Sequence, residues 1–318
     1  MMLCAPVSGT IGAQKVFRIS QAAQGQNFRG RRSNADRMIL SSEPLKPIFT
    51  AHLFPALEAR LIELLRSLSA DDWEKQTLAP KWKVKDIAAH LLDTETRGLA
   101  AVRHGYKPEN SKKLTQEKLL TLIDTLNAEG VRAYRQLPPE ELIAKMEVAS
   151  RELAVYVQGL DPFAPAVFPV SWAGEEESPN WFHTAREFTE RWHHQQQIRV
   201  AVNRPGIMTR ELYFPVLDCF LRALPFTYRN VAAKPGSLAQ FDIAGECGGS
   251  WYLFRDGGAW LLIASPEGEI ISEVTIPQEI AWRIFTKGIS TSEARTQVQI
   301  AGDETLGGHI LKMISIVG

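Results

Sequence analysis

The spacing of apolar residues along the chain changes at about residue 235. Up to about residue 225 they recur every three to four positions, the period of amphipathic helices that bury one face. Leucines 53, 57, 61, 64, 65 and 68 form the first such stripe. Similar stripes predict further helices at about 82–103, 116–126, 138–153, 178–202 and 209–224. The first part of the chain is therefore expected to be a helical bundle.

After Pro235 the pattern becomes typical of short strands. Segments 238–244, 250–255, 259–265 and 270–276 are expected to be strands, and 256–258 (Asp-Gly-Gly) is a hairpin signal between two of them. The same pattern predicts a helix at 277–287, another strand at 296–301 and a closing helix at 304–316. An α+β domain should therefore follow an all-α domain.

These patterns divide the chain into three parts: 1–44, a disordered or over-extended tail; 45–229, the helical domain; and 230–318, the smaller α+β domain. Residues 1–37 carry six basic side chains against one acid and show no apolar periodicity. Although such a leader superficially resembles a transit peptide, we interpret it as a disordered tail or an over-extended gene start, with Met38 as an alternative beginning.

Composition narrows the function further. The 36 basic and 36 acidic residues cancel, so no global basic field favours binding to nucleic acid or to a membrane. Three cysteines without a C-x-x-C pair indicate neither a disulfide framework nor a cysteine zinc site. No apolar run approaches the roughly 20 residues that span a bilayer. We expect a soluble, cytoplasmic protein that acts on a small molecule; its oligomeric state is not predicted.

The predicted helix at 178–202 carries the densest polar stripe. His183, Glu187, Glu190, His194 and Gln197 are spaced by four, three, four and three residues, which places them on one helical face. A stripe of this kind is usually the solvated side of an amphipathic helix. Spacing alone does not separate that interpretation from a functional site.

The helix at 82–103 offers a partner for this stripe, because His90 lies there among apolar neighbours. If the two helices face each other, His90 would meet Glu190 and His194. Two imidazoles and a carboxylate suit a borderline divalent ion and leave coordination positions open, as in catalytic sites. Asp86 and Glu187 are candidates to orient the imidazoles.

The alternative of a di-iron site requires a second Glu-x-x-His unit besides Glu190 and His193. None of the other six histidines has a glutamate three residues before it, so this alternative is excluded. His193 is turned by about 100° from His194 around the helix and is assigned to the surroundings of the site or to the surface.

Residues 82–91 (WKVKDIAAHL) and 190–199 (ERWHHQQQIR) together resemble the DinB-like superfamily, particularly its mycothiol-dependent maleylpyruvate isomerase branch. The resemblance covers about residues 48–225 and implies a DinB-like four-helix bundle with His90, Glu190 and His194 as metal ligands. The closing segment, with 301–306 (AGDETL), looks like the sterol-carrier-like domain often appended in this branch.

The resemblance implies a divalent metal, with zinc as the expected ion, and mycothiol or an equivalent small thiol as cosubstrate. It thus implies an isomerase or S-transferase acting on a small electrophile. Two alternatives stay open: a hydrolase using metal-activated water at the same site, and a carrier that binds an apolar ligand in the C-terminal domain. The aromatic residues around Trp251 and Trp260 would line such a pocket, although a closed core explains them at least as well.

Overall fold

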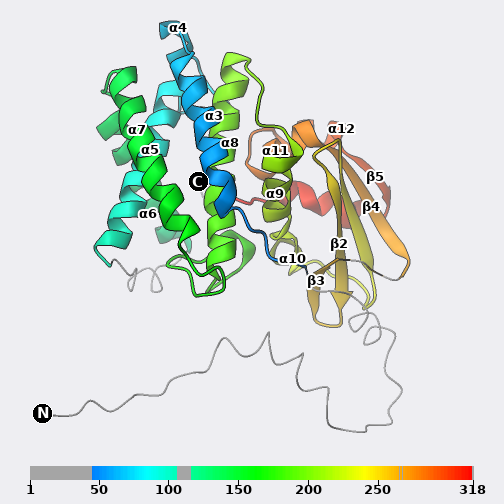
Figure 1. Cartoon of the computed structure of the whole chain (residues 1–318). Helices are drawn as coiled ribbons and strands as arrows, with labels where there is room; N and C mark the ends of the chain where they lie inside the picture. The colour runs from blue at the N-terminus through cyan, green and yellow to red at the C-terminus, as the bar shows by residue number, and fades with distance from the viewer. Residues whose placement is uncertain (1–44, 106–115, 265, 267, 317–318) are drawn as a thin grey trace, which may run out of the picture.

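The computed structural model describes residues 45–105, 116–264, 266 and 268–316 (Figure 1). The expected tail at 1–44 lies outside the described residues. The first part is helical: five long helices lie side by side, and α5 contacts α6, α7 and α8 while α3 contacts α7 and α8. These helices are α3 (Phe54–Arg66), α5 (Val84–Arg103), α6 (Gln116–Tyr134), α7 (Pro139–Gln158) and α8 (Asn180–Val202). Short helical turns lie between them: η1 (Ala51–Leu53), α4 (Ala70–Trp73) and η3 (Ser171–Ala173).

Local sequence sets the ends of the two helices that matter most for the site. At the start of α5, the Asp86 carboxylate accepts a hydrogen bond from the backbone N–H of Lys83 at 3.0 Å, which satisfies a donor that the helix leaves open. Helix α8 ends at Asn203, whose φ of 54° lies in the left-handed region that asparagine tolerates. Both helices therefore begin and end close to the positions that the sequence predicts.

Helix α8 is the central element of the fold. Every residue from 191 to 199 is buried, which includes His194 and Gln197 of the polar stripe, and the other three stripe residues are half-buried. On one side, Ile198 and Val202 join an apolar cluster with α3, α5 and α7. On another, Trp192 joins a larger cluster that continues into the C-terminal part. The helix is buried between the bundle and the sheet domain.

The C-terminal part is a five-stranded mixed sheet with the order β3-β2-β1-β4-β5. Strand β1 pairs in parallel with β4, and the other neighbours are antiparallel. The strands are β1 (Leu238–Ala244), β2 (Gly249–Asp256), β3 (Ala259–Ile263), β4 (Ile270–Pro277) and β5 (Gln299–Gly302). The accompanying helices are α11 (Gln278–Phe285), α12 (Thr291–Gln297), α13 (Glu304–Gly308) and η4 (His309–Lys312).

Two helices join the parts: α9 (Arg210–Leu221), which contacts α8 and α11, and α10 (Leu224–Tyr228), which contacts β3. The Trp192 ring stacks on Tyr213 of α9 with centroids 4.3 Å apart and planes within 2°. Trp282 of α11 meets Trp192 edge to face at 6.2 Å. The apolar core is thus continuous from the bundle to the sheet. None of the described helices is long and apolar enough to cross a membrane.

The predicted fold class, a helical bundle followed by a smaller α+β domain, is confirmed. The bounds of β1 agree with the prediction, but two predictions near the C-terminus are wrong. Thr296 and Gln297 end helix α12 instead of opening a strand, because the Ser290 hydroxyl accepts from the Glu293 N–H and caps that helix. The closing helix ends at Gly308, after which η4 and an extended tail follow.

Candidate metal centre

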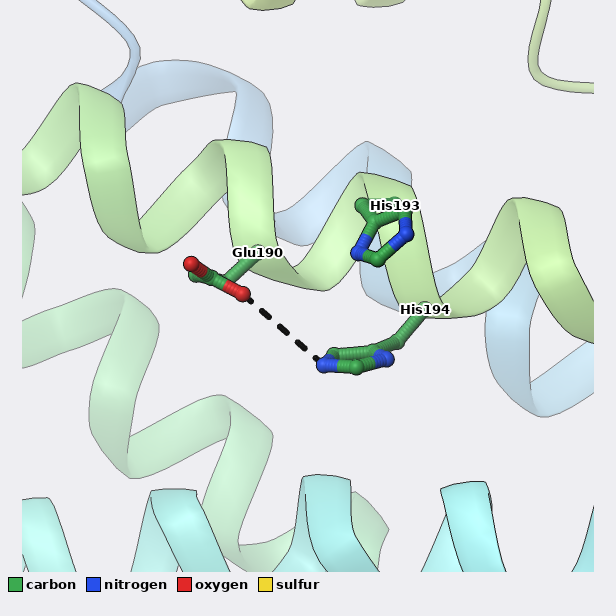
Figure 2. A group of neighbouring side chains, drawn as sticks. All are labelled: Glu190, His193 and His194. Carbon is green, nitrogen blue, oxygen red and sulfur yellow. Dashed lines mark ion pairs between the residues drawn. The ribbon is translucent and has the colours of Figure 1, made fainter. Parts of the chain in front are cut away.

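Two of the three side chains expected to bind metal meet across the helices, and the third lies beside one of them. Helix α5 carries His90, and α8 carries Glu190 and His194. The His90 and His194 rings meet edge to face with centroids 4.7 Å apart. Nε2 of His194 lies 3.8 Å from Oε2 of Glu190, as the dashed line in Figure 2 marks. His90 and His194 therefore meet across α5 and α8, and Glu190 lies beside His194 on α8.

A hydrogen bond fixes the form of the His194 ring. Its Nδ1 lies 2.9 Å from Oε1 of Gln197, and an amide oxygen only accepts, so Nδ1 carries the hydrogen. Nε2 of the neutral ring then keeps its lone pair and faces the Glu190 carboxylate. Two atoms bound to one zinc ion at about 2.1 Å and a tetrahedral angle lie about 3.4 Å apart, close to the observed separation. A lone pair facing a carboxylate oxygen at this distance suits a shared cation.

His90 is the donor from the bundle side. Its side chain is buried, and its Nδ1 has no hydrogen-bond partner among the described residues. The Trp82 ring lies against it with centroids 4.6 Å apart. Burial, followed by the positive electrostatic influence of His194 and Arg97, holds the pKa of His90 well below its ordinary value of 6.5. The ring is neutral at pH 7, the form that binds metals.

Burial also sets the protonation of the other two groups. It lowers the pKa of His194 to about 4. It raises the pKa of Glu190 to about 7, with Arg186 opposing this shift and Glu187 adding to it. A bound cation favours the ionised form of the half-buried Glu190 carboxyl beside the neutral imidazoles. This donor set, two nitrogens and one oxygen, fits a borderline divalent ion such as zinc.

His193 lies closer to this centre than the sequence indicated. Within the described part of the chain, one group of three His, Cys, Asp or Glu side chains has potential ligand atoms that all lie within 4.8 Å of one another. Its members are Glu190, His193 and His194. In Figure 2, Glu190 and His194 extend to the same side of α8, and His193 leaves the helix at another angle. The set of His90, Glu190 and His194 stays a prediction, with His193 as an additional neighbour.

The two carboxylates expected to orient the imidazoles have other contacts. Asp86 caps α5 and lies 3.3 Å from Nε of Arg135. Glu187 accepts a hydrogen bond from Arg186 at 2.7 Å, and the same guanidinium lies 2.9 Å from Nδ1 of His183. The residue that does hold a ligand ring is Gln197, three positions after His194. Its place on the polar stripe was a signal for it; Trp82 opens the 82–91 motif but was assigned no role there.

A second buried polar cluster, which the sequence did not reveal, lies in the bundle. It takes one residue from each of α3, α5, α7 and α8: Glu58, Glu95, Ser150 and Arg191. Nη1 of Arg191 donates to Glu95 at 2.7 Å and lies 3.5 Å from Glu58. The Ser150 hydroxyl lies 3.0 Å from Glu95 and 3.3 Å from Glu58. We refer to these four residues as the bundle network.

The bundle network contains more acid than base. One guanidinium neutralises one carboxylate, and the single hydroxyl proton of Ser150 can be donated to only one of them at a time. Burial raises the pKa of Glu95 to about 8, with Arg191 opposing this shift and Glu58 adding to it. Burial raises the pKa of Glu58 as well. The two carboxyls therefore retain a proton between them at neutral pH.

The bundle is a helical domain with a candidate metal site at its centre. Residues 54–199 match the family model described as the mycothiol maleylpyruvate isomerase N-terminal domain. Residues 54–199 are thus similar to that family, in agreement with the resemblance of the two motifs. A comparison with curated protein sequences gave no match.

Two solved structures resemble the chain at low sequence identity. One is the crystal structure of the mycothiol-dependent maleylpyruvate isomerase, with 12% identity and a TM-score of 0.41 over 74% of this chain and 86% of that one. The other is a histidine-to-alanine mutant of the mycothiol-dependent maleylpyruvate isomerase, with 11% identity and a TM-score of 0.47 over 79% of this chain and 91% of that one.

Proposed function

We propose that this protein is a metal-dependent enzyme that uses a small-molecule thiol to isomerise a small electrophile or to transfer the thiol to it. His90, Glu190 and His194 are the proposed ligands. The observation that carries the proposal is the lone pair of His194 Nε2, which faces the half-buried Glu190 carboxylate at 3.8 Å. The match of residues 54–199 to the mycothiol maleylpyruvate isomerase N-terminal domain supports this class of reaction.

Neither cysteine in the described part of the chain is placed to supply the thiol of this reaction, so we assign that role to a small molecule. The two described cysteines, Cys219 and Cys247, are both buried. Burial raises the pKa of the Cys219 thiol to about 12, so it stays protonated at neutral pH. A bound divalent ion supplies positive charge that favours a thiolate or an enolate oxygen at neutral pH.

The other residues of the site prepare it for that chemistry. Gln197 keeps Nε2 of His194 free of its proton. Trp82 covers both imidazoles, with its ring 4.6 Å from His90 and 5.8 Å from His194, which limits the access of water from that side. The proposed site thus has fixed ligands and one aromatic wall.

The first test is the metal content of purified protein. We expect one divalent ion per chain in the parent and a large loss in His90→Ala and His194→Ala, measured by elemental analysis. His309→Ala serves as control because that histidine packs on Tyr228 in the C-terminal domain. Unchanged metal content in His90→Ala would contradict the three-ligand centre.

The second test separates the two enzymatic alternatives. Metal-loaded protein is incubated with a small thiol and a maleyl-type electrophile, and consumption of the electrophile is followed over time. We expect turnover that requires both metal and thiol. Turnover without any thiol would indicate the hydrolase instead.

The structure gives no support to a carrier site at the aromatic strand residues. The Trp251, Phe254 and Trp260 side chains are all buried. The indole N–H of Trp251 donates to Asp218 and that of Trp260 donates to the Val231 carbonyl. These rings fill a core and satisfy their polar atoms within it, as a closed domain requires.

A further inference from the structure

His193 occupies a position that the proposed three-ligand centre does not use. We propose that His193 is a fourth ligand of the metal, beside His90, Glu190 and His194. This inference rests on the proposed function, because it needs the metal centre to exist.

Proximity is the first argument. The potential ligand atoms of Glu190, His193 and His194 lie within 4.8 Å of one another, and the His193 and His194 ring centroids are 4.9 Å apart. His193 and His194 lie three and four positions after Glu190, so each can reach toward the Glu190 carboxylate one turn away. Modest rotation of the side chains would bring these atoms to coordination distance.

The second argument is that the His193 ring has no hydrogen-bond partner among the described residues. Its side chain is 2% exposed, and neither ring nitrogen has a hydrogen bond to any described residue. Buried polar groups in folded proteins are nearly always paired, and an imidazole always offers at least one N–H or lone pair that needs a partner. A bound ion would satisfy one of the two nitrogens.

The aromatic rings packed nearest to His193 are paired, although other buried polar atoms of α8, such as Oε1 and Nε2 of Gln195, also have no partner among the described residues. The indole N–H of Trp192, the preceding residue, donates to the Ile207 carbonyl at 3.0 Å. The hydroxyl of Tyr213, which stacks on Trp192, donates to the Gln278 carbonyl at 2.7 Å. Polar atoms of neighbouring buried rings therefore have partners, while those of His193 do not. An ordinary core histidine would be paired in the same way.

A fourth ligand changes what the centre can do. Three imidazoles and one carboxylate occupy all four positions of a tetrahedral coordination sphere. An external thiol or substrate can then bind only if the ion accepts five or more ligands. The proposal thus predicts a centre with more than four ligands during the reaction. It also predicts tighter metal binding than three ligands would give.

Cobalt(II) provides the test, because its visible absorption depends on the number and geometry of its ligands. The full-length chain is loaded with cobalt(II), and its spectrum and dissociation constant are measured by competition with a chelator. His193→Ala and His193→Gln are compared with the parent, and His183→Ala is the matched control on the same helix. Circular dichroism shows which variants are folded; His193→Gln, which keeps more of the side-chain volume, replaces His193→Ala if the latter fails to fold.

We expect both His193 variants to bind cobalt at least tenfold more weakly and with a changed spectrum, and His183→Ala to match the parent. Added imidazole should restore the parent spectrum in His193→Ala. The proposal is overturned if folded His193 variants keep the parent spectrum and affinity while His90→Ala loses cobalt, a result that leaves the three-ligand centre intact. Cobalt binding unchanged in both His90→Ala and His194→Ala would overturn the centre itself, and the fourth ligand with it.

Discussion

Replacement of Glu95 by glutamine should remove a pH dependence from the stability of the protein. Glu95 is fully buried in the bundle network, and burial raises its pKa to about 8 from the ordinary value of 4.5. A group with a raised pKa holds its proton more tightly in the folded chain than in the unfolded one. Its stabilising contribution is therefore complete below pH 4.5 and is lost as the pH rises through about 8.

The size of the effect follows from the two pKa values. As the pH rises from 4.5 to just above 8, the loss of the Glu95 proton should lower the free energy of unfolding by on the order of 5 kcal/mol. Buried histidines with lowered pKa values act in the opposite direction, but only below about pH 7, where the unfolded chain takes up their protons. Above pH 7 the histidines contribute little, and from pH 7 to pH 8.5 the loss through Glu95 should be about 1 kcal/mol. Glu190, whose pKa burial raises to about 7, adds a smaller fall in the same interval.

Glu95→Gln keeps the shape and an acceptor oxygen for Arg191 but has no proton to lose. We expect its unfolding free energy, measured by urea denaturation followed by circular dichroism, to fall by about 1 kcal/mol less than that of the parent from pH 7 to pH 8.5. Glu141→Gln is the control, because Glu141 is an exposed carboxylate paired with Lys145 at 3.5 Å. If Glu95→Gln and Glu58→Gln both keep the full slope of the parent, the shared proton is not in the bundle network.

Three further predictions concern other parts of the structure. Gln197→Leu removes the acceptor that orients His194 and should weaken metal binding by about 10- to 100-fold, measured by chelator competition. Trp192→Ala deletes a fully buried ring that stacks on Tyr213 and should lower the unfolding free energy by about 3–5 kcal/mol in denaturant titrations. Gly174 has a φ of 83°, and a Cβ there would lie 2.5 Å from the Phe226 ring. Gly174→Ala should destabilise by about 1–3 kcal/mol, more than Gly236→Ala, where φ is 87° and no atom lies within 4 Å.

Local patterns in the sequence were sufficient for most of the helices and strands. Strand β1 and the start of α5 could be predicted because alternation and a capping aspartate act within a few residues. The parallel pairing of β1 with β4 could not, because it depends on contacts between segments far apart in the chain. The predicted closing helix is too long for a local reason, because Gly307 and Gly308 weaken a helix. The tail after it is held instead by Ser315, which donates to the Phe285 and Phe220 carbonyls.

The site divides in the same way. Spacing alone placed Glu190 and His194 on one face, and the resemblance joined them to His90 on a distant helix. A polar stripe on a helix is usually solvated, and no local signal shows that a sheet domain covers α8 from the other side. The burial of His193 and Arg191 is therefore a tertiary effect, as is the bundle network, whose four members come from four separate helices.

The continuous packing from Trp192 through Tyr213 to Trp282 has a consequence for anyone who wishes to dissect the molecule. A fragment that stops near residue 229 would leave large aromatic surfaces on the far side of the helix that holds Glu190 and His194. Such a fragment should aggregate or bind the ion more weakly, even though it contains every proposed ligand. The C-terminal domain thus covers one side of α8, and a truncation that removes this domain also changes the surroundings of the proposed ligands.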